Sequence, residues 1–252
     1  MSISKTYDSL VISSASTGES DLLVTLLSRN NGKIKCIAKG AKRSTKRFMN
    51  ALEPFTHIDA VVRSSSGSGL SLLENATVRE GYEVIRSDYK KFILASLCLE
   101  LVDLWCREDQ EEQGIYLLLL WYLSSLCGDR DGLLSTLIFK TRLLDACGYL
   151  PRIDTCSICN GPVQGRWIFY DPATGQPCCQ SCQNGQNGYK ISMATGMSVH
   201  FWQSQPLEKI FRLKISSLVA EEAWSYLKNL HSNVLERQPR AYKLVDRLFK
   251  QP

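Results

Sequence analysis

The sequence predicts an α+β protein with more than one domain, and three patterns along its 252 residues support this. Residues 1–80 contain short segments with the alternation that is typical of half-buried β-strands. From residue 81 onward the spacing of apolar residues changes to that of helices, and two CxxC cysteine pairs interrupt this helical part. We therefore expect a strand-rich domain at 1–80 and a helical domain at 81–252, with an insertion at about 152–189.

Five candidate strands lie in the first domain. They are residues 5–13, 21–29, 33–39, 55–63 and 70–78. Turn-forming residues separate them at 17–19, 30–32 and 64–69. Five short strands in eighty residues fit a small closed barrel, such as an OB-fold, better than a sandwich.

Three leucine-rich helices follow at residues 89–106, 115–127 and 133–147, and we expect them to form an α-helical bundle. The tail from residue 200 to 250 adds at least one more helix, at 218–230. Ser217 is its expected N-cap, and Glu221 and Glu222 lie near its positive end.

The segment from Gly32 to Arg47 is strongly basic and contains no acidic residue. Its seven basic residues are Lys33, Lys35, Lys39, Lys42, Arg43, Lys46 and Arg47. Residues 33–39 alternate and predict a strand, whereas 40–47 lack an apolar period and predict a mobile loop. Close cations repel one another unless an anion neutralises them, and the nucleic-acid backbone carries matching repeated charge. A solvated surface strand and loop is the alternative interpretation.

Phe48 follows this basic segment directly, and two roles are open to it. Its ring could stack on a base, as aromatic side chains do in many single-strand-binding OB-folds. Packing in the core or under the loop is the commoner fate of an aromatic residue.

Charge is unevenly distributed along the chain. Residues 1–80 hold 11 basic and 7 acidic side chains, residues 81–150 hold 7 and 11, and residues 151–252 hold 12 and 7. Two positive ends around a negative middle favour contact of the ends with a polyanion. A second basic patch lies at 235–250, although a solvated helix face explains it nearly as well; its members are Arg237, Arg240, Lys243, Arg247 and Lys250.

The most specific local pattern is Cys156-Ser-Ile-Cys159 followed, after nineteen residues, by Cys179-Gln-Ser-Cys182. Two CxxC pairs at this spacing predict one structural Zn²⁺ per chain, held by four thiolates without an open position. Cys178 adjoins Cys179 and is an alternative ligand, although the CxxC spacing favours Cys179. Between the pairs, 166–170 predicts a strand and 172–175 its hairpin turn.

The sequence does not support an enzyme. A zinc deaminase requires an H-x-E motif, and none of His57, His200 and His231 is followed by x-Glu. A thioredoxin-like CxxC requires a βαβ setting, which the pattern of elements lacks. The five other cysteines lie singly in apolar segments and are expected to be small buried hydrophobes.

The N-terminus lacks the apolar region of a signal peptide, and the longest apolar run, 115–123, is too short to span a bilayer. We therefore expect a cytoplasmic protein that does not contact the membrane. Ten cysteines in such a chain indicate metal ligands or buried thiols before disulfides.

Several motifs, spread over nearly the whole chain, resemble those of the bacterial RecO family of recombination mediators and DNA repair proteins. The resemblance rests on Gly18–Asp21 before a leucine-rich strand, Gly32-Lys33 with Ala38–Arg43, Leu52–Phe55, the 97–103 segment LCLELVD, and the 143–160 segment with Gly148–Pro151 and Cys156/Cys159 in register. Asn160 departs from the family pattern, in which glycine is usual at this place.

The resemblance implies an N-terminal OB-fold, a helical C-terminal domain with an inserted zinc element, and a nucleoid-associated location in the cytoplasm. It implies binding to single- and double-stranded DNA and annealing of complementary strands. It also implies partnership with RecR and with the single-strand-binding protein SSB, so that RecA loads onto coated DNA. A second hypothesis is a protein-interaction adaptor whose helices and zinc element dock partners, with DNA contact incidental.

Overall fold

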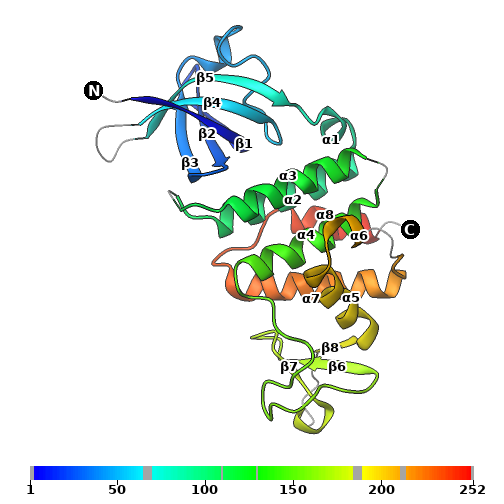
Figure 1. Ribbon diagram of the computed structural model, residues 1–252. Coiled ribbons are helices and arrows are strands. Elements are labelled where there is room, and N and C mark those ends of the chain that lie inside the picture. Colours follow the sequence, from blue (N-terminus) through cyan, green and yellow to red (C-terminus); the bar gives the residue numbers. More distant parts are fainter. Residues whose placement is uncertain are drawn as a thin grey trace. The chain divides into compact units, whose positions relative to one another are not determined.

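The computed structural model describes residues 3–64, 70–108, 110–128, 130–183, 189–210 and 214–250, while the side chains of 249 and 250 stay undescribed. Most of the turn predicted at 64–69 and the Lys250 side chain therefore lie outside the described residues. The chain divides into two compact units, residues 1–129 with 239–252 and residues 130–238 (Figure 1). The domain boundary predicted at residue 80 remains a prediction, because this division follows compactness and groups two long helices with the strands.

The first unit contains a closed five-stranded barrel, which confirms the predicted OB-fold. Its strands are β1 (Ser4–Thr17), β2 (Asp21–Ser28), β3 (Gly32–Ala38), β4 (His57–Arg63) and β5 (Ser71–Glu80), in the order β1-β2-β3-β5-β4. β1 is antiparallel to both β2 and β4, and it thereby closes the barrel. β3 and β5 form the single parallel pairing among these strands.

The alternation seen in the sequence produces the barrel core. Val24 and Leu26 on β2, Cys36 on β3 and Ile58 on β4 point inward and are fully buried. A bulge in β1 between Val11 and Ser13 shifts the register of its pairing with β2. The strand bends at such a bulge, which helps β1 to pair with β2 as well as with β4. Cys36 behaves as a small hydrophobe, as expected, and its burial raises the pKa of the thiol to about 12.

The described part of the first unit also contains the helices α1 (Glu83–Ser87), α2 (Tyr89–Trp105), α3 (Gln113–Cys127) and α8 (Tyr242–Lys250). The side chain of Asp88 caps α2 by accepting hydrogen bonds from the amides of Lys90 and Lys91. α2 packs against β1 and α8. On α3, the Tyr116 hydroxyl donates to Asp8 Oδ1 of β1 over 2.7 Å, which ties the helix to the barrel.

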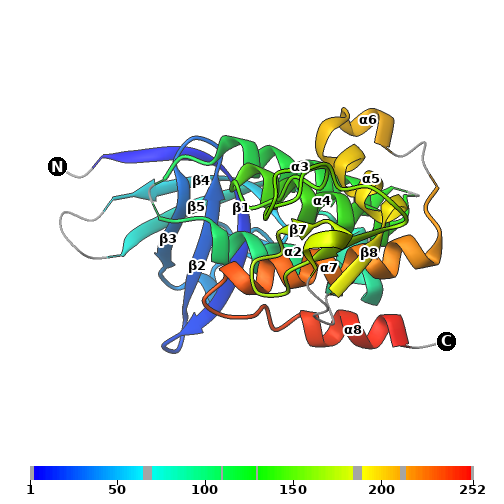
Figure 2. The ribbon, with the colours of Figure 1, turned by 90° about the horizontal axis from the view of Figure 1, so that it is seen from below.

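The second unit joins a helical bundle to a small sheet. Its helices are α4 (Gly132–Ala146), α5 (Met193–Ser204), α6 (Leu207–Ile210) and α7 (Ser217–Val234). The strands β6 (Trp167–Tyr170), β7 (Pro177–Cys178) and β8 (Tyr189–Ser192) pair in the order β7-β6-β8. α4, α5 and α7 pack on one another, and β6 and β8 lie against α5 while β8 also contacts α7 (Figure 2).

A predicted hairpin joins β6 to β7, and one glycine makes it possible. Gly175 has a φ of +71°, and a Cβ at this position would lie 2.0 Å from Cδ2 of Leu230 on α7. The Tyr226 hydroxyl donates to the Gly175 carbonyl, and its ring packs edge-on against Tyr170 of β6. Only glycine combines this backbone conformation with so close an approach of the helix.

Two details of the C-terminal region differ from the sequence-based expectation. The N-cap of α7 is Ser216, whose hydroxyl accepts from the Val219 amide, and not Ser217, which is the first helical residue. The carboxylate of Glu222 binds the start of α5 and not the N-terminal amides of α7. It accepts hydrogen bonds from the amide and hydroxyl of Ser192 and from the hydroxyl of Thr195.

None of the helices within the described ranges combines the length and the hydropathy that are needed to cross a bilayer.

We expect Glu222→Gln to destabilise the protein by about 1–2 kcal/mol at pH 7, since several hydrogen bonds to a partly buried carboxylate are weakened. Burial opposes ionisation of Glu222, but the bonds from Ser192 and Thr195 outweigh it and lower the pKa below its usual 4.5. The stabilisation is therefore fully present above about pH 4.5 and is lost as the pH falls through the folded-state pKa.

Urea unfolding of the two proteins at pH 7 and pH 4 measures this effect. Glu221→Gln is the matched control, because Glu221 is exposed on the same helix and should change stability by less than about 0.5 kcal/mol. Equal effects of the two substitutions would contradict the role assigned to Glu222.

Candidate metal centre and nucleic-acid interface

Four cysteine side chains of the second unit meet at one point. The Sγ atoms of Cys156, Cys159, Cys179 and Cys182 all lie within 4.8 Å of one another, and Cys159 Sγ and Cys179 Sγ are 3.9 Å apart. Thiolates around a tetrahedral ion with metal–sulfur distances of about 2.3 Å would be about 3.8 Å apart. The cluster could therefore hold a metal ion.

Tight backbone turns bring each CxxC pair together. In the first turn the amide of Asn160 donates to the Cys156 carbonyl, and the amide of Cys156 donates to the Gly161 carbonyl. In the second turn the Cys182 amide donates to the Cys179 carbonyl. Asn160 has a φ of +57°, which asparagine tolerates better than most residues, so its departure from glycine leaves the turn intact.

Hydrogen bonds within the cluster shift the pKa values of two of its thiols in opposite directions. Amide donors from Cys159, Cys179 and Ile158, the first of them the strongest, outweigh burial and lower the pKa of Cys156 to about 6. Metals bind the thiolate form, so a lowered pKa suits a ligand. Cys182 holds its proton instead, because hydrogen bonding to Cys179 and Cys159 raises its pKa to about 12. A bound cation would displace that proton.

Cys178 lies apart from the four clustered thiols. It belongs to β7, where it pairs with Phe169 of β6. Burial, followed by the charges of Cys156 and Cys179, raises its pKa. Because the four clustered thiols include Cys179 and not Cys178, the geometry favours Cys179 as the fourth ligand.

The basic segment divides into two parts with different surroundings. Lys33 on β3 is only 8% exposed, and its ammonium group donates to the carbonyl of Asp103 over 2.6 Å and to its carboxylate over 3.2 Å. Lys35 pairs with Glu108, with Nζ and Oε1 2.6 Å apart, and this hydrogen bond raises the pKa of Lys35. The two strand lysines thus bind the C-terminal end of α2 and the segment that follows it.

The five basic residues beyond β3 are all exposed: Lys39, Lys42, Arg43, Lys46 and Arg47. The loop that carries them has local structure, since residues Ala41–Arg43 form a 3₁₀ turn. The amide of Gly40 donates to Asp21 Oδ1 over 2.8 Å, and this bond is the main cause of the lowered pKa of Asp21. Arg47 donates to the Lys39 carbonyl over 2.7 Å, which brings the two ends of the basic loop together.

Phe48 takes the core role of its two expected roles. Its side chain is only 5% exposed and belongs to the barrel core, while the Arg47 guanidinium lies 4.9 Å from the centre of its ring. In the tail, Arg240, Lys243 and Arg247 are exposed on the first unit.

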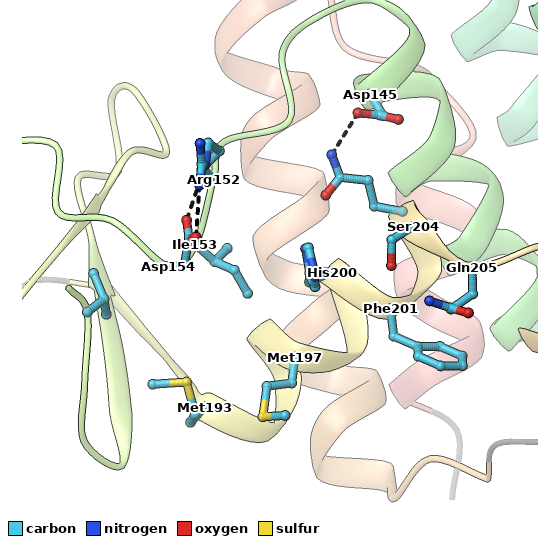
Figure 3. Close-up of a pocket in the computed structure, with 12 residues that line it drawn as sticks. Asp145, Arg152, Ile153, Asp154, Met193, Met197, His200, Phe201, Ser204 and Gln205 are labelled. Atoms are coloured by element: carbon cyan, nitrogen blue, oxygen red, sulfur yellow. Dashed lines mark hydrogen bonds and ion pairs between the residues drawn. The ribbon is translucent and has the colours of Figure 1, made fainter.

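A groove of about 800 Å³ lies in the second unit, and no pattern in the sequence predicted it (Figure 3). Met193, Met197 and Phe201 of α5 line it together with Ile153 and Val163 from the segment before β6. Ser192 is the sequence signal that could have predicted α5, the helix that lines much of the groove. Ser192 is the N-cap of this helix, and its hydroxyl accepts a hydrogen bond from the Thr195 amide.

The acidic side chains in this groove already have partners. Asp154 pairs with Arg152 over 3.0 Å, and Asp145 Oδ1 accepts from the side-chain Nε2 of Gln203 over 2.8 Å (Figure 3). The remaining lining is largely apolar and contains two methionines, which adapt to irregular partner surfaces. Such a groove suits the docking of another molecule better than acid–base chemistry.

A closed OB-fold barrel with an exposed basic loop, joined to a helical unit with a thiol cluster, defines a class of modular nucleic-acid-handling proteins, because this barrel is a recurrent platform for oligonucleotides. Comparison with known proteins identifies the family within this class. The family model described as Recombination protein O N terminal matches residues 1–82, and the one described as Recombination protein O C terminal matches residues 86–243. The chain belongs to the RecO family, and its role lies in DNA repair and recombination.

Curated relatives agree with the family models. The DNA repair protein RecO of Syntrophus aciditrophicus is 31% identical over 247 residues, which cover 96% of this chain and 95% of that protein. The DNA repair protein RecO of Anaeromyxobacter sp. strain K is 35% identical over 176 residues, covering 70% and 69%. That of Roseiflexus sp. strain RS-1 is 28% identical over 240 residues, covering 95% and 84%.

The geometry of the cluster predicts different effects for a cysteine inside it, Cys182, and a cysteine outside it, Cys178. Cys182→Ser should reduce bound metal to a small fraction of the wild-type content and lower the melting temperature, because metal binding is coupled to local folding. Cys178→Ser should keep about one ion per chain, since its thiol is not part of the cluster.

Elemental analysis of the purified proteins, together with thermal melts, measures both effects. Similar metal loss in the two variants would show that Cys178 takes part in binding.

Proposed function

We propose that this chain is a non-catalytic recombination mediator that binds single- and double-stranded DNA and anneals complementary strands. With RecR, it would help RecA to load onto DNA coated by SSB, in the cytoplasm near the nucleoid. The observation that carries the proposal is the basic loop, defined as residues 39–47, whose five basic side chains are all exposed beside a closed OB-fold barrel. Family membership supports the same role.

The proposed phosphate contacts are Lys39, Lys42, Arg43, Lys46 and Arg47. Lys35 is a weaker candidate, because a phosphate would have to replace Glu108 as its partner. Lys33 is left out, because its ammonium group is buried against α2. Contacts with the backbone alone give affinity without sequence preference. They also reduce the repulsion between two strands, and the base edges stay available for pairing.

We propose that the metal is Zn²⁺ and that its role is structural. Four clustered thiols match the ligands that zinc prefers, and a site closed by four thiolates has no position for a substrate. When bound, the ion supplies cross-links between the two CxxC turns. The cysteines hold the insertion together, and their backbone amides orient Cys156.

A second part of the proposal concerns protein partners, and the groove along α5 supports it. Met197 is 64% exposed within a largely apolar surface, which is the kind of surface that partner proteins bury. We propose that RecR or SSB docks there. This surface also supports the adaptor hypothesis, in which DNA contact would be incidental.

We expect Arg43→Glu with Lys46→Glu to weaken DNA binding and annealing while leaving the fold and metal content unchanged. These two side chains are chosen because Lys42 and Arg47 also donate to backbone carbonyls of the barrel loops. With about five phosphates neutralised, the slope of log affinity against log salt should be about −4, and the double variant should lose about 2 units of it.

The control changes the same charge elsewhere, with Lys90→Glu and Lys209→Glu, both of them exposed. Fluorescence anisotropy at several salt concentrations and an annealing time course provide the data. A loop variant that anneals at the wild-type rate would favour the adaptor hypothesis over DNA mediation.

We expect Met197→Glu to weaken binding to RecR or SSB by about tenfold or more, because a charge would be placed at the centre of a buried apolar contact. DNA affinity should not change, since the basic loop belongs to the other unit. The control is Leu218→Glu, another exposed apolar residue of the second unit. Titration with each purified partner is the measurement, and unchanged binding to both partners would remove the groove from the proposal.

A further inference from the structure

A small hollow opens on the barrel surface next to the basic loop. It has a volume of about 240 Å³ and lies among the end of β1, the 3₁₀ turn of the basic loop and residues 48–54. Its lining includes Ala41, which directly precedes Lys42 and Arg43, and Phe48, which directly follows Arg47. A strand whose phosphates follow the basic loop would therefore pass beside this hollow.

The buried part of the lining is apolar and belongs to the fixed part of the barrel. Phe48 and Leu52 are buried members of the barrel core, and Leu22 packs against that core. The turn that forms one side is held by a hydrogen bond from the Ala51 amide to the Phe48 carbonyl, and the Ala76 amide of β5 donates to the Arg47 carbonyl. The hollow is thus formed before any ligand arrives, which reduces the entropic cost of binding.

Polar groups stand at the rim of the same hollow. The Asn50 side chain offers both a donor and an acceptor, and the Ser14 hydroxyl can act as either. Glu53 adds an acceptor, and its charge is balanced because Arg86 Nε lies 3.1 Å from its Oε2. Apolar walls with a mixed set of donors and acceptors match a flat ring that carries hydrogen-bonding groups at its edge.

The volume of the hollow limits the size of the ligand that it can hold. Pockets for drug-sized molecules have volumes of roughly 300–1,000 Å³, so this hollow suits a smaller ring system. Its place beside five exposed cations favours a ring that is attached to an anionic chain.

We propose that this hollow holds one unpaired nucleobase of single-stranded DNA while the basic loop holds the adjoining phosphates; the inference rests on the DNA-binding function proposed above. A base in a duplex is stacked and paired, and extruding it costs energy. The hollow therefore adds a contact that is independent of salt and available to single strands alone. The mixed rim accepts different bases, so the contact gives preference for single strands and not for a sequence.

The test compares two oligonucleotides of equal length, one with ordinary bases and one with an abasic sugar–phosphate backbone of the same charge. The wild-type protein should bind the first roughly tenfold more tightly, as expected for one seated base. Ser14→Leu fills the hollow from β1 and should abolish this preference, while affinity for the abasic strand and the salt slope stay unchanged.

Ala15→Leu is the matched control. It introduces the same side chain one position along β1, where residues point to the opposite face and Ala15 is exposed, so the preference should persist. Asn50→Gly is a second variant that keeps the left-handed backbone, whose φ is +54°, and removes the rim amide. It should reduce the preference severalfold, and it carries the test if Ser14→Leu does not fold.

The outcomes separate this inference from the proposed function. Salt-dependent binding of both oligonucleotides with equal affinity would overturn the base site and leave DNA binding standing. A preference that survives Ser14→Leu in folded protein, or one that Ala15→Leu also abolishes, would overturn it as well. Absence of binding to either oligonucleotide would contradict the DNA-binding function itself.

Discussion

Closure of the barrel by β1 is the constraint on which the candidate DNA-binding surface depends. This strand has 14 residues and pairs with β2 along one part and with β4 along another. Without that double pairing, β1 and β4 would present open edges, and the segment between β3 and β4 would have no fixed base. The basic loop lies in this segment, and the hollow lies between this segment and residues of β1 and β2, so the geometry of both follows from closure.

Tertiary contacts also sort the positive charges into two groups. Lys33 and Lys35 are held by Asp103 and Glu108, whereas the five basic residues that follow are exposed. Burying Lys33 is tolerable because its ammonium group is paired with a carboxylate and a helix carbonyl, which offset the loss of hydration. Removing the Asp103 carboxylate would leave the buried ammonium group with the helix carbonyl but without its counter-charge. This pair therefore holds α2 to the barrel more than it serves DNA.

The insertion in the second unit has a small apolar core, and a second kind of interaction is needed to stabilise it. Its sheet has only short strands, and Ile168, Tyr170 and Ile191 are its buried apolar residues, packed toward α5 and α7. In the two CxxC turns most of the described residues are exposed or half-buried, so little apolar surface is buried there. A metal held by four thiolates would stabilise those turns where hydrophobic packing does not. The bonds of Tyr226 and Glu222 to the insertion and to α5 connect the two regions.

The sequence by itself determined the five strands, the long helices and the four-cysteine cluster, because each depends on local periodicity or on ligand spacing within a short segment. The strand bounds differ from the expected ones by a few residues, and the asparagine at 160 still makes its turn. What the tertiary structure decided is which groups meet across long separations. Lys33 meets Asp103 seventy residues away, Ser216 caps α7 in place of its neighbour, and Phe48 enters the core. No local pattern contains these outcomes, since the charge or burial of a side chain depends on neighbours that only the closed fold brings together.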